Sequence, residues 1–462
     1  MNTLSSTIPN IQKQSLPLVG HQHAHQIVAW QGTRAITLAQ FLADVTTVKN
    51  LLPKSQHIFN MCADRYHFAV GLAAAIVTGR ISLLPSTHTP DMVRQMQVFA
   101  PDVFCLHDLV HCEIDLPKFQ FPDSPNCEDS SDSVCVIPQI DSAQLVAIVF
   151  TSGSTGTPVP HHKYWGTLQG SVLAEAKRIG LPKETNAGTI IGTVPAQHMY
   201  GLESSVLLAL QSGHALSSKQ PFYPADIVCA LESVPAPRIL VSTPVHMRML
   251  LEAQIDIPEV ALVLSATAPL SLTLAQELEQ KLKAPLQEIY GSTETGTIAT
   301  RRPTQTDEWH LFDEVELIQQ DEKTFATGGQ ALGKVVMNDV IELKLDKRFL
   351  LQGRTTDLIN IAGRRSSITH LNHQLNSIAG VLDGTFYMPD DDSPDHVVRL
   401  IACVVAPTLT QQQIIAALRE LVAPVFIPRP LFIVPALPRN STGKLPREAL
   451  KKLIQTLRTK QI

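Results

Sequence analysis

Residues 150–158 read Phe-Thr-Ser-Gly-Ser-Thr-Gly-Thr-Pro and follow directly on the apolar run of residues 145–150, Leu-Val-Ala-Ile-Val-Phe. Such a run is typical of a buried strand. Small hydroxyl residues and glycines at its end leave backbone N–H groups and hydroxyls facing open space, and no large side chain blocks a ligand. The stretch therefore predicts a phosphate-binding loop made of Thr151, Ser152, Gly153, Ser154, Thr155 and Gly156.

The predicted loop is not of the Walker type, which requires G-x-x-x-x-G-K-[ST]. The nearest such spacing runs from Gly328 to Gly333 and Lys334, and Val335 stands where the metal-binding hydroxyl is needed. The sequence therefore favours a nucleoside triphosphate held by a different kind of loop.

Length, charge and composition exclude several classes of protein. At 462 residues the chain exceeds one ordinary hydrophobic core, so two or three domains are expected. A net charge of −5, with no run of Lys and Arg, argues against a nucleic-acid partner. The chain start lacks the features of a secretion signal, and the longest apolar segment, Phe68–Val77, is about half of a membrane span. With seven scattered cysteines, we expect a soluble, cytoplasmic protein.

Short apolar strands alternate with helical segments along most of the chain. Strands are predicted at His57–Met61, Ile81–Pro85, Thr189–Val194, Ile239–Ser242, Val260–Ser265 and Leu286–Tyr290, and helices at Phe68–Thr78 and Leu272–Leu282. This alternation predicts an α/β fold with helix-covered, mainly parallel sheets and ligand-binding loops at the strand ends.

A smaller α/β unit is predicted at the C-terminal end, with a strand at Val397–Val405 and helices at Leu409–Val422 and Arg447–Thr456. We therefore expect a large N-terminal domain at residues 1–354 and a small, mobile lid domain at residues 355–462.

Four further segments offer chemistry that agrees with a nucleotide site. Tyr290-Gly291-Ser292-Thr293-Glu294 follows a strand and supplies a ring to stack on a base and oxygens for Mg²⁺. Asp339 and Arg354 are candidates to reach ribose hydroxyls. Residues 195–201, Pro-Ala-Gln-His-Met-Tyr-Gly, place His198 at a strand end. Residues 438–444, Pro-Arg-Asn-Ser-Thr-Gly-Lys, place Lys444 after a flexible turn.

Taken in order, these segments resemble the adenylate-forming superfamily of acyl-CoA synthetases, aryl acid ligases, adenylation domains of peptide synthetases, and luciferases. The resemblance spans nearly the whole chain, and it implies a site for ATP and Mg²⁺. By that resemblance, residues 151–156 hold the β- and γ-phosphates, Tyr290 and Gly291 contact adenine, and Ala266 lies along the adenine and acyl pocket. It likewise implies that Asp339 and Arg354 bind ribose. The catalytic residues implied are Lys444, Glu294, Thr293 and His198, with Glu294 and Thr293 also serving the metal.

The chain departs from the family in several places. Val159 stands where the family usually has a phosphate-facing lysine, and Lys163, with His161 or His162, is the candidate substitute. His370 replaces a glutamate of the family, and Thr356 replaces the common hinge aspartate or lysine.

His198 and its neighbours favour an aryl or fatty carboxylic acid over an amino acid, because amino-acid-activating relatives usually have Phe-Asp there. In its compact length and its altered loop, the chain resembles ligases that load hydroxybenzoate-type or fatty starters onto a carrier protein in aryl-polyene or pigment pathways. The expected reaction forms acyl-AMP from a small acid and ATP, then transfers the acyl group to the phosphopantetheine of an acyl carrier protein or to CoA. The alternatives are a non-catalytic homologue that binds nucleotide or acid, an amino-acid-activating enzyme, and an oxygen-using member.

Overall fold

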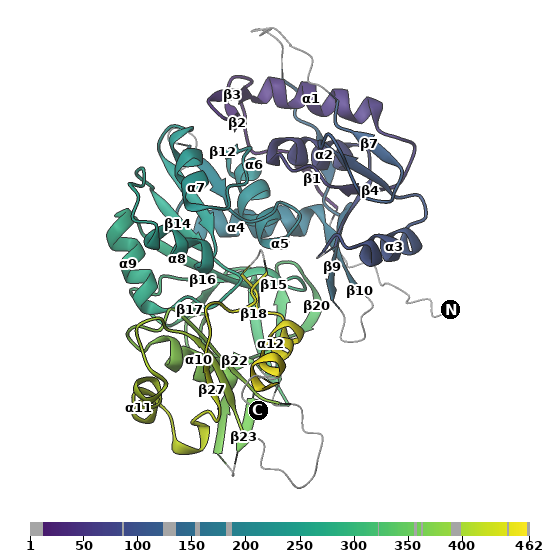
Figure 1. The fold of residues 1–462 in the computed structure, drawn as a ribbon. Coiled ribbons are helices and arrows are strands. Elements are labelled where there is room, and N and C mark those ends of the chain that lie inside the picture. The colour runs from purple at the N-terminus through teal and green to yellow at the C-terminus, as the bar shows by residue number, and fades with distance from the viewer. Residues whose placement is uncertain are drawn as a thin grey trace.

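The computed structural model describes residues 13–85, 87–122, 135–152, 158–181, 187–321, 323–354, 358–361, 364–389, 399–440 and 443–459. In that part of the chain, two large sheets with their helices form the N-terminal region, and a smaller group of elements lies at the C-terminal end (Figure 1). None of the described helices is long and apolar enough to cross a membrane.

One sheet has six strands and contains the apolar run that decides the fold. In spatial order these are β10 (Pro158–Tyr164), β9 (Leu145–Ser152), β5 (Ile81–Leu84), β4 (His57–Asn60), β6 (Phe104–His107) and β7 (Lys118–Gln120). β10 pairs antiparallel with β9, and the remaining pairs are parallel. Ala147 and Val149 pack into one apolar cluster while Ile148 and Phe150 pack into another. Both faces of β9 are therefore buried, which explains its unbroken apolar sequence.

The second sheet has eleven strands. In spatial order they are β21 (Asp339–Leu343), β22 (Arg348–Arg354), β17 (Trp309–Leu311), β16 (Gly296–Arg301), β15 (Leu286–Ser292), β14 (Leu262–Ser265), β13 (Arg238–Ser242), β11 (Thr189–Gly192), β12 (Ala215–Ser217), β2 (Ile27–Gln31) and β3 (Arg34–Thr37). The strands from β15 through β14, β13, β11 and β12 to β2 are parallel, and antiparallel pairs extend the sheet at both ends. The predicted α/β class is confirmed, and the antiparallel extension beyond β15 is a feature that the strand–helix alternation did not predict.

Smaller sheets complete the large region. They are β1 (Ser15–Pro17) with β8 (Gln139–Asp141), and the three-stranded sheet of β18 (Val315–Gln320), β19 (Lys323–Gly328) and β20 (Ala331–Val336). A further pair, β23 (Leu358–Ile361) with β24 (Arg364–Ser367), lies at the start of the C-terminal elements.

Helices cover both large sheets (Figure 1). They are α1 (Leu38–Leu51), α2 (Arg65–Val77), α3 (Pro90–Phe99), α4 (Trp165–Arg178), α5 (Met199–Gly201), the π-helical turn η1 (Leu202–Leu207), α6 (Leu208–Ser212), α7 (Pro224–Glu232), α8 (Pro244–Glu252) and α9 (Leu272–Leu282). α2 contacts β4 and β5 of one sheet and β12 of the other, so it is buried on nearly all sides. Its Ala-rich, uniformly apolar sequence follows from this central position.

The predicted elements of the large region lie close to the observed ones. Helix Leu272–Leu282 has the predicted bounds, and α2 begins three residues before the predicted Phe68, at Arg65. The Asp64 side chain accepts hydrogen bonds from Tyr66 N and His67 N and so fixes that earlier start.

The C-terminal elements have a core of their own. Strands β25 (Asp383–Tyr387), β26 (Ile401–Val405) and β27 (Leu431–Ile433) form one sheet, with α10 (Ile368–Asn376), α11 (Gln411–Leu421), the short η3 (Pro424–Phe426) and α12 (Arg447–Thr459) around it. Ala402 and Val404 pack with α10 and α11, whereas Ile401 and Cys403 pack with α12. The strand predicted at Val397–Val405 has its first two residues outside the described part of the chain, and β26 begins at Ile401.

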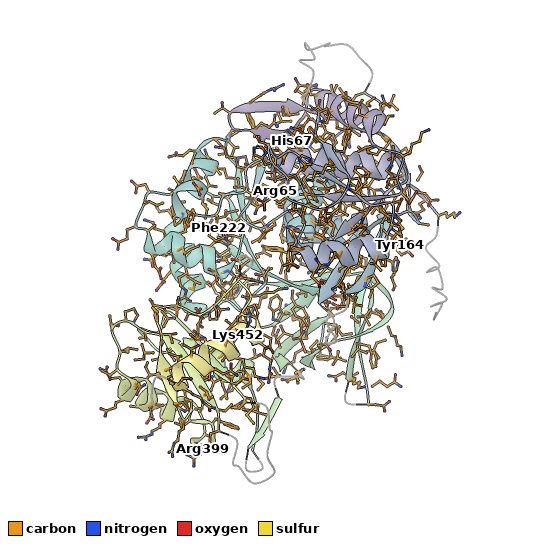
Figure 2. The ribbon with its side chains drawn as sticks, turned by 45° about the vertical axis from the view of Figure 1, so that its right-hand side comes forward. Arg65, His67, Tyr164, Phe222, Arg399 and Lys452 are labelled. Carbon is orange, nitrogen blue, oxygen red and sulfur yellow. The ribbon has the colours of Figure 1, made fainter. Side chains whose placement is uncertain are left out.

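A buried arginine ties α2 to the eleven-stranded sheet. Arg65 is 1% exposed and donates to four backbone carbonyls, those of Ser217, Lys219, Gly192 and Val194. Gly192 permits this approach, since an added Cβ there would lie 3.0 Å from Arg65 Nη2. Burial chiefly lowers the pKa of Arg65 to about 10, against the opposing charge of Asp64, so the guanidinium stays charged at neutral pH. Figure 2 labels Arg65 where the purple N-terminal elements meet the teal ones.

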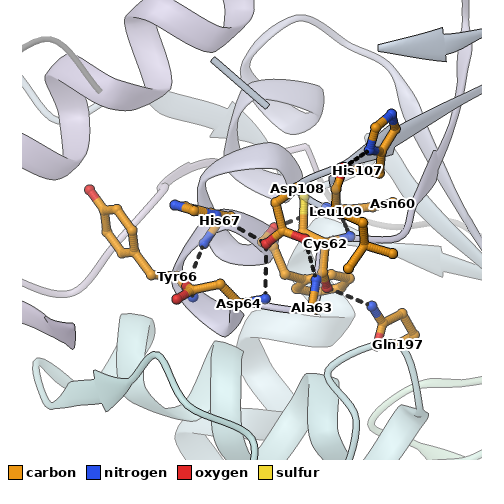
Figure 3. A network of polar contacts seen from close by, with 11 residues as sticks. Asn60, Cys62, Ala63, Asp64, Tyr66, His67, His107, Asp108, Leu109 and Gln197 are labelled. Carbon is orange, nitrogen blue, oxygen red and sulfur yellow. Dashed lines mark hydrogen bonds and ion pairs between the residues drawn. The ribbon is translucent and has the colours of Figure 1, made fainter. Parts of the chain in front are cut away.

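The turn before α2 is held by a histidine–aspartate pair (Figure 3). Asp108 accepts hydrogen bonds from Ala63 N at 2.8 Å and Asp64 N at 2.9 Å, and lies 3.0 Å from His67 Nδ1. The His67 ring stacks on Phe121 with centroids 4.2 Å apart. Burial acts to lower the pKa of His67, but the hydrogen bond to Asp108 and the charges of Asp64 and Asp108 outweigh it, so its pKa is raised.

This pair predicts a pH-dependent contribution to stability. Because the pKa of His67 is higher in the folded chain than its unfolded value of about 6.5, its contribution is complete below pH 6.5 and is lost as the pH rises through the folded pKa. His67→Gln should remove this dependence of the free energy of unfolding on pH, which is on the order of 1 kcal/mol for a partly exposed pair. Urea unfolding between pH 5.5 and 8.5 measures it. The exposed His25→Gln is the matched control, and an unchanged pH dependence in His67→Gln would contradict the assignment.

Candidate active site

The end of the phosphate-loop strand faces the turn after β15. Thr151 Oγ1 on β9 lies 2.9 Å from His161 Nε2 on β10, and the same nitrogen lies 3.7 Å from Glu294 Oε1. Glu294 keeps 38% of its side chain exposed. The structure therefore brings two predicted site residues, Thr151 and Glu294, together across the two sheets, with His161 between them. The side chain of Ser152 and residues 153–156 lie outside the description.

Tyr290 and Asp339 form a second part of the same site. The Tyr290 hydroxyl donates to Asp339 Oδ2 at 2.5 Å, and the Tyr290 ring packs against Trp309 and Phe349. These rings hold the tyrosine in one orientation, with Gly291 exposed beside it. The β21–β22 register places Asp339 directly opposite Arg354, whose side chain is not described. Both predicted ribose residues therefore share one end of this strand pair.

His198 lies at the start of α5, where it is the residue before the first helical turn. Its Nδ1 accepts from Tyr200 N at 3.3 Å, which leaves Nε2 as the N–H donor. Burial and the nearby Lys444 ammonium lower the pKa of His198 to about 4, so the imidazole is neutral at physiological pH. A neutral His198 offers a hydrogen bond but no counter-charge to a carboxylate.

The turn that carries Lys444 is built within the C-terminal region. Arg439 makes a two-pronged contact with Asp383, at 2.7 and 2.8 Å, and also donates to Gly443 O at 3.0 Å. Asn440 accepts from the backbone N–H groups of both Gly443 and Lys444. These bonds fix the position of Lys444 relative to β25.

The same turn is docked on the large region. Gly443 has φ of +77°, and an added Cβ would lie 3.2 Å from Val245 Cγ2 and 3.7 Å from Thr243 Oγ1. Thr243 and Val245 lie at the carboxyl end of β13 and the start of α8. The positive φ and the close approach both favour glycine here. Lys444 is therefore held beside the strand ends, near His198.

Lys163 does not occupy the position of a phosphate-facing lysine. It is 1% exposed, and its ammonium donates to Thr293 O at 2.6 Å and to Gln330 Oε1 at 3.1 Å. Of the three residues considered as substitutes for the missing loop lysine, His161 is the one in contact with both Thr151 and Glu294.

The remaining predicted residues are placed as follows. Ala266 directly follows β14 and packs against the main apolar cluster, and the next residue, Thr267, has φ of +78°. A positive φ at a non-glycine residue is strained backbone of the kind found at binding sites. His370 lies exposed in the first turn of α10, and Thr356 is outside the described residues.

Several residues of the site were not predicted from the sequence. Arg439 belongs to the segment quoted for Lys444, but its partner Asp383 lies 56 positions away, and nothing in the local sequence connects the two. Gln330, the buried partner of Lys163, was also missed, because buried polar partners from distant segments leave no spacing pattern.

Comparison with known proteins agrees with this geometry. The AMP-binding enzyme family matches residues 56–330. The 4-coumarate–CoA ligase of Halorhodospira halophila is 29% identical over 307 residues, which cover 64% of this chain and 73% of that protein. The 4-coumarate–CoA ligase of Rhodobacter capsulatus is 28% identical over 235 residues, and the chain spans 58% of its length. Both relatives are named as ligases that join 4-coumarate to CoA.

Solved structures share the fold over almost the whole chain. ATP-bound MatB from Rhodopseudomonas palustris superposes with a TM-score of 0.78 at 17% identity, covering 94% of this chain and 97% of that one. MenE, the o-succinylbenzoate CoA synthetase of Bacillus subtilis, in complex with its acyl-adenylate intermediate, gives 0.75 at 18% identity, covering 92% and 95%. The chain therefore belongs to the AMP-binding enzyme family, and its fold is that of the adenylate-forming enzymes.

Proposed function

We propose that the protein activates a small carboxylic acid with ATP as acyl-AMP and passes the acyl group to a thiol. The observation that carries the proposal is the docking of the Lys444 turn against Thr243 and Val245, beside His198. That position sets a cation where a carboxylate at His198 would meet the nucleotide site of Thr151, Tyr290 and Glu294.

The chemistry requires such a cation. A carboxylate oxygen attacks the α-phosphorus of ATP and pyrophosphate leaves, so two anions must approach one another. The Lys444 ammonium offsets their repulsion and stabilises the charge on the transferring group. In the second step the thiol sulfur attacks the acyl carbonyl, AMP leaves with the electron pair, and the thiol proton passes to solvent.

The residues present suit a magnesium ion beside the phosphates. Glu294 offers a part-exposed carboxylate and Thr293 a hydroxyl, and both are the hard oxygen ligands that Mg²⁺ takes. Bound Mg²⁺ would neutralise phosphate charge. We assign Glu294 and Thr293 to that ion, residues 151–156 to the phosphates, Tyr290, Gly291 and Ala266 to adenine, and Asp339 with Arg354 to ribose.

The acid side favours an aromatic or fatty acid. His198 is neutral, and the adjoining Tyr200 is buried and donates to Ser242 O. The nearby carboxylate of Glu203 is buried and already accepts hydrogen bonds from Gln330 and Thr297, so the described part of this segment presents no exposed carboxylate to an α-ammonium. Relatives named as 4-chlorobenzoate–CoA and 2-succinylbenzoate–CoA ligases favour an aryl acid. The acceptor is CoA or the phosphopantetheine of a carrier protein, and the relatives favour CoA.

We further propose that residues 355–462 act as a lid that moves between the two half-reactions, in the cytoplasm. The separate core of the C-terminal elements supports a movable unit. The free cysteine thiols of the described residues agree with a reducing compartment.

Acid-dependent pyrophosphate release from MgATP, measured over benzoates, cinnamates, fatty acids and amino acids, tests the proposal. One class of acid should support release, and mass spectrometry of the product with CoA and with a phosphopantetheinylated carrier protein then names the acceptor. Absence of pyrophosphate release with every acid, while MgATP still binds, would contradict the proposal and favour a non-catalytic homologue. Oxygen uptake during turnover would indicate the oxygen-using alternative.

A further inference from the structure

Lys163 is a charged residue in the interior of the large region. It lies on β10, opposite Ala147 of β9, and is 1% exposed. A buried ammonium is costly unless it is hydrogen-bonded and its charge is balanced. Here Nζ donates to the backbone carbonyl of Thr293 at 2.6 Å and to Gln330 Oε1 at 3.1 Å.

The balancing charge is that of a buried glutamate, Glu203, which is connected to Lys163 through the side chain of Gln330. Glu203 is 2% exposed and lies in η1, just after the segment that carries His198. Its Oε1 accepts from Gln330 Nε2, and its Oε2 accepts from Thr297 Oγ1 at 3.3 Å. Gln330 therefore links the two charged groups through its own amide, with its oxygen toward Lys163 and its nitrogen toward Glu203.

The network connects three parts of the site that are distant in sequence. β10 returns from the phosphate loop, the turn between β15 and β16 bears Thr293 and Glu294, and η1 continues the helix that starts directly after His198. Burial lowers the pKa of Lys163 to about 8 although the charges of Glu203 and Glu294 oppose the shift, so the cation is retained at neutral pH.

Stability alone does not explain a lysine at this position. Replacing a buried ion pair with apolar residues of similar volume is often neutral or stabilising. What an apolar side chain cannot do is donate to the Thr293 carbonyl. That bond fixes the orientation of the peptide group between Thr293 and Glu294, and hence the direction of the Glu294 side chain.

We propose that Lys163 is a positioning residue of the nucleotide site, which sets the Thr293–Glu294 peptide, and with it the metal-binding carboxylate, against the strand that returns from the phosphate loop. This inference rests on the proposed function for the identity of the ligand, MgATP. Lys163 thus differs in role from the lysine that the family places after the phosphate loop, because Lys163 binds the protein turn and not the phosphates.

Three variants separate positioning from simple stability. Lys163→Met removes the bond to Thr293 and leaves Glu203 uncompensated, so it is expected to lower both stability and MgATP affinity. Lys163→Met/Glu203→Gln removes both charges and restores stability but not the Thr293 bond. Glu203→Gln alone is the matched control, because it disturbs the same network and keeps that bond.

The measurements are the affinity for MgATP by titration calorimetry, KM for MgATP and for the acid, and the melting temperature of each full-length variant. The double variant should melt close to the wild type, bind MgATP about tenfold more weakly, the loss typical of one charge-assisted hydrogen bond, and keep its KM for the acid. Glu203→Gln should bind MgATP within about threefold of the wild type.

Wild-type MgATP affinity in the double variant would overturn the inference, as would losses in all three variants that follow their melting temperatures. Failure of the proposed function is distinguishable, because a wild-type protein that binds MgATP without acid-dependent pyrophosphate release still reports the effect of Lys163 by calorimetry.

Discussion

Lys444→Ala should lower acid-dependent pyrophosphate release by about 10²–10³-fold, the loss seen when one donor to a developing charge is removed. The structure holds this ammonium beside His198, on a turn whose glycine lies against Thr243 and Val245. Alanine leaves the turn intact, since the bonds of Arg439 and Asn440 to the turn do not involve the Lys444 side chain. The KM for MgATP should change much less than kcat.

Lys452→Ala is the matched control, because Lys452 lies exposed on α12 of the same C-terminal region (Figure 2). It should retain wild-type release. Thiol transfer from a chemically prepared acyl-AMP should be much less affected by Lys444→Ala than release is. If the Lys444→Ala enzyme releases pyrophosphate within threefold of the wild-type rate, Lys444 has no catalytic role in the first half-reaction.

Arg65→Met should lower the free energy of unfolding by about 3–5 kcal/mol, the range for removing one partner of a buried charged network. Methionine fills part of the space but donates nothing, so the carbonyls of Gly192, Val194, Ser217 and Lys219 lose the donor that Arg65 gives them. Each such loss costs about 1–3 kcal/mol when water cannot replace the donor. Urea unfolding of the full chain measures the change.

Arg80→Met is the matched control for Arg65. Arg80 also donates to backbone carbonyls, those of Ser55 and Pro53, but it is part-exposed and water can take its place. Its loss should cost about 1 kcal/mol. Equal unfolding midpoints for the two variants would show that the interior position of Arg65 adds nothing to stability.

Local sequence was sufficient for many of the elements, and it supplied the segments that the candidate site combines. Apolar runs bounded by small residues located β4, β5, β11, β13 and β15, because a strand buried on both faces has little choice of side chain. The segments at residues 151, 290–294 and 444 each carry their chemistry within a few positions. The structure places Thr151 near Glu294 and Lys444 near His198.

The interior polar contacts could not be predicted from the sequence. Arg65, Lys163 and Glu203 look like ordinary surface residues in their local context, and their partners lie more than ninety positions away. In the sequence, Lys163 is a candidate phosphate ligand because it lies four positions after Val159, where the family has its lysine. The prediction could not foresee that β10 turns this side chain inward, since in a strand a shift of one position reverses the face.

The bonds of Arg439 to Asp383 and to Gly443 have a consequence for the timing of the reaction cycle. Conformational entropy is lost when a flexible segment becomes ordered, and here the ordering takes place once, as the C-terminal unit folds. In the lid motion proposed above, each later encounter of that unit with the large region joins two preorganised surfaces. Under that proposal, the frequency with which Lys444 arrives should follow the rigid-body motion of the unit, and depend on solvent viscosity more than on the composition of the turn.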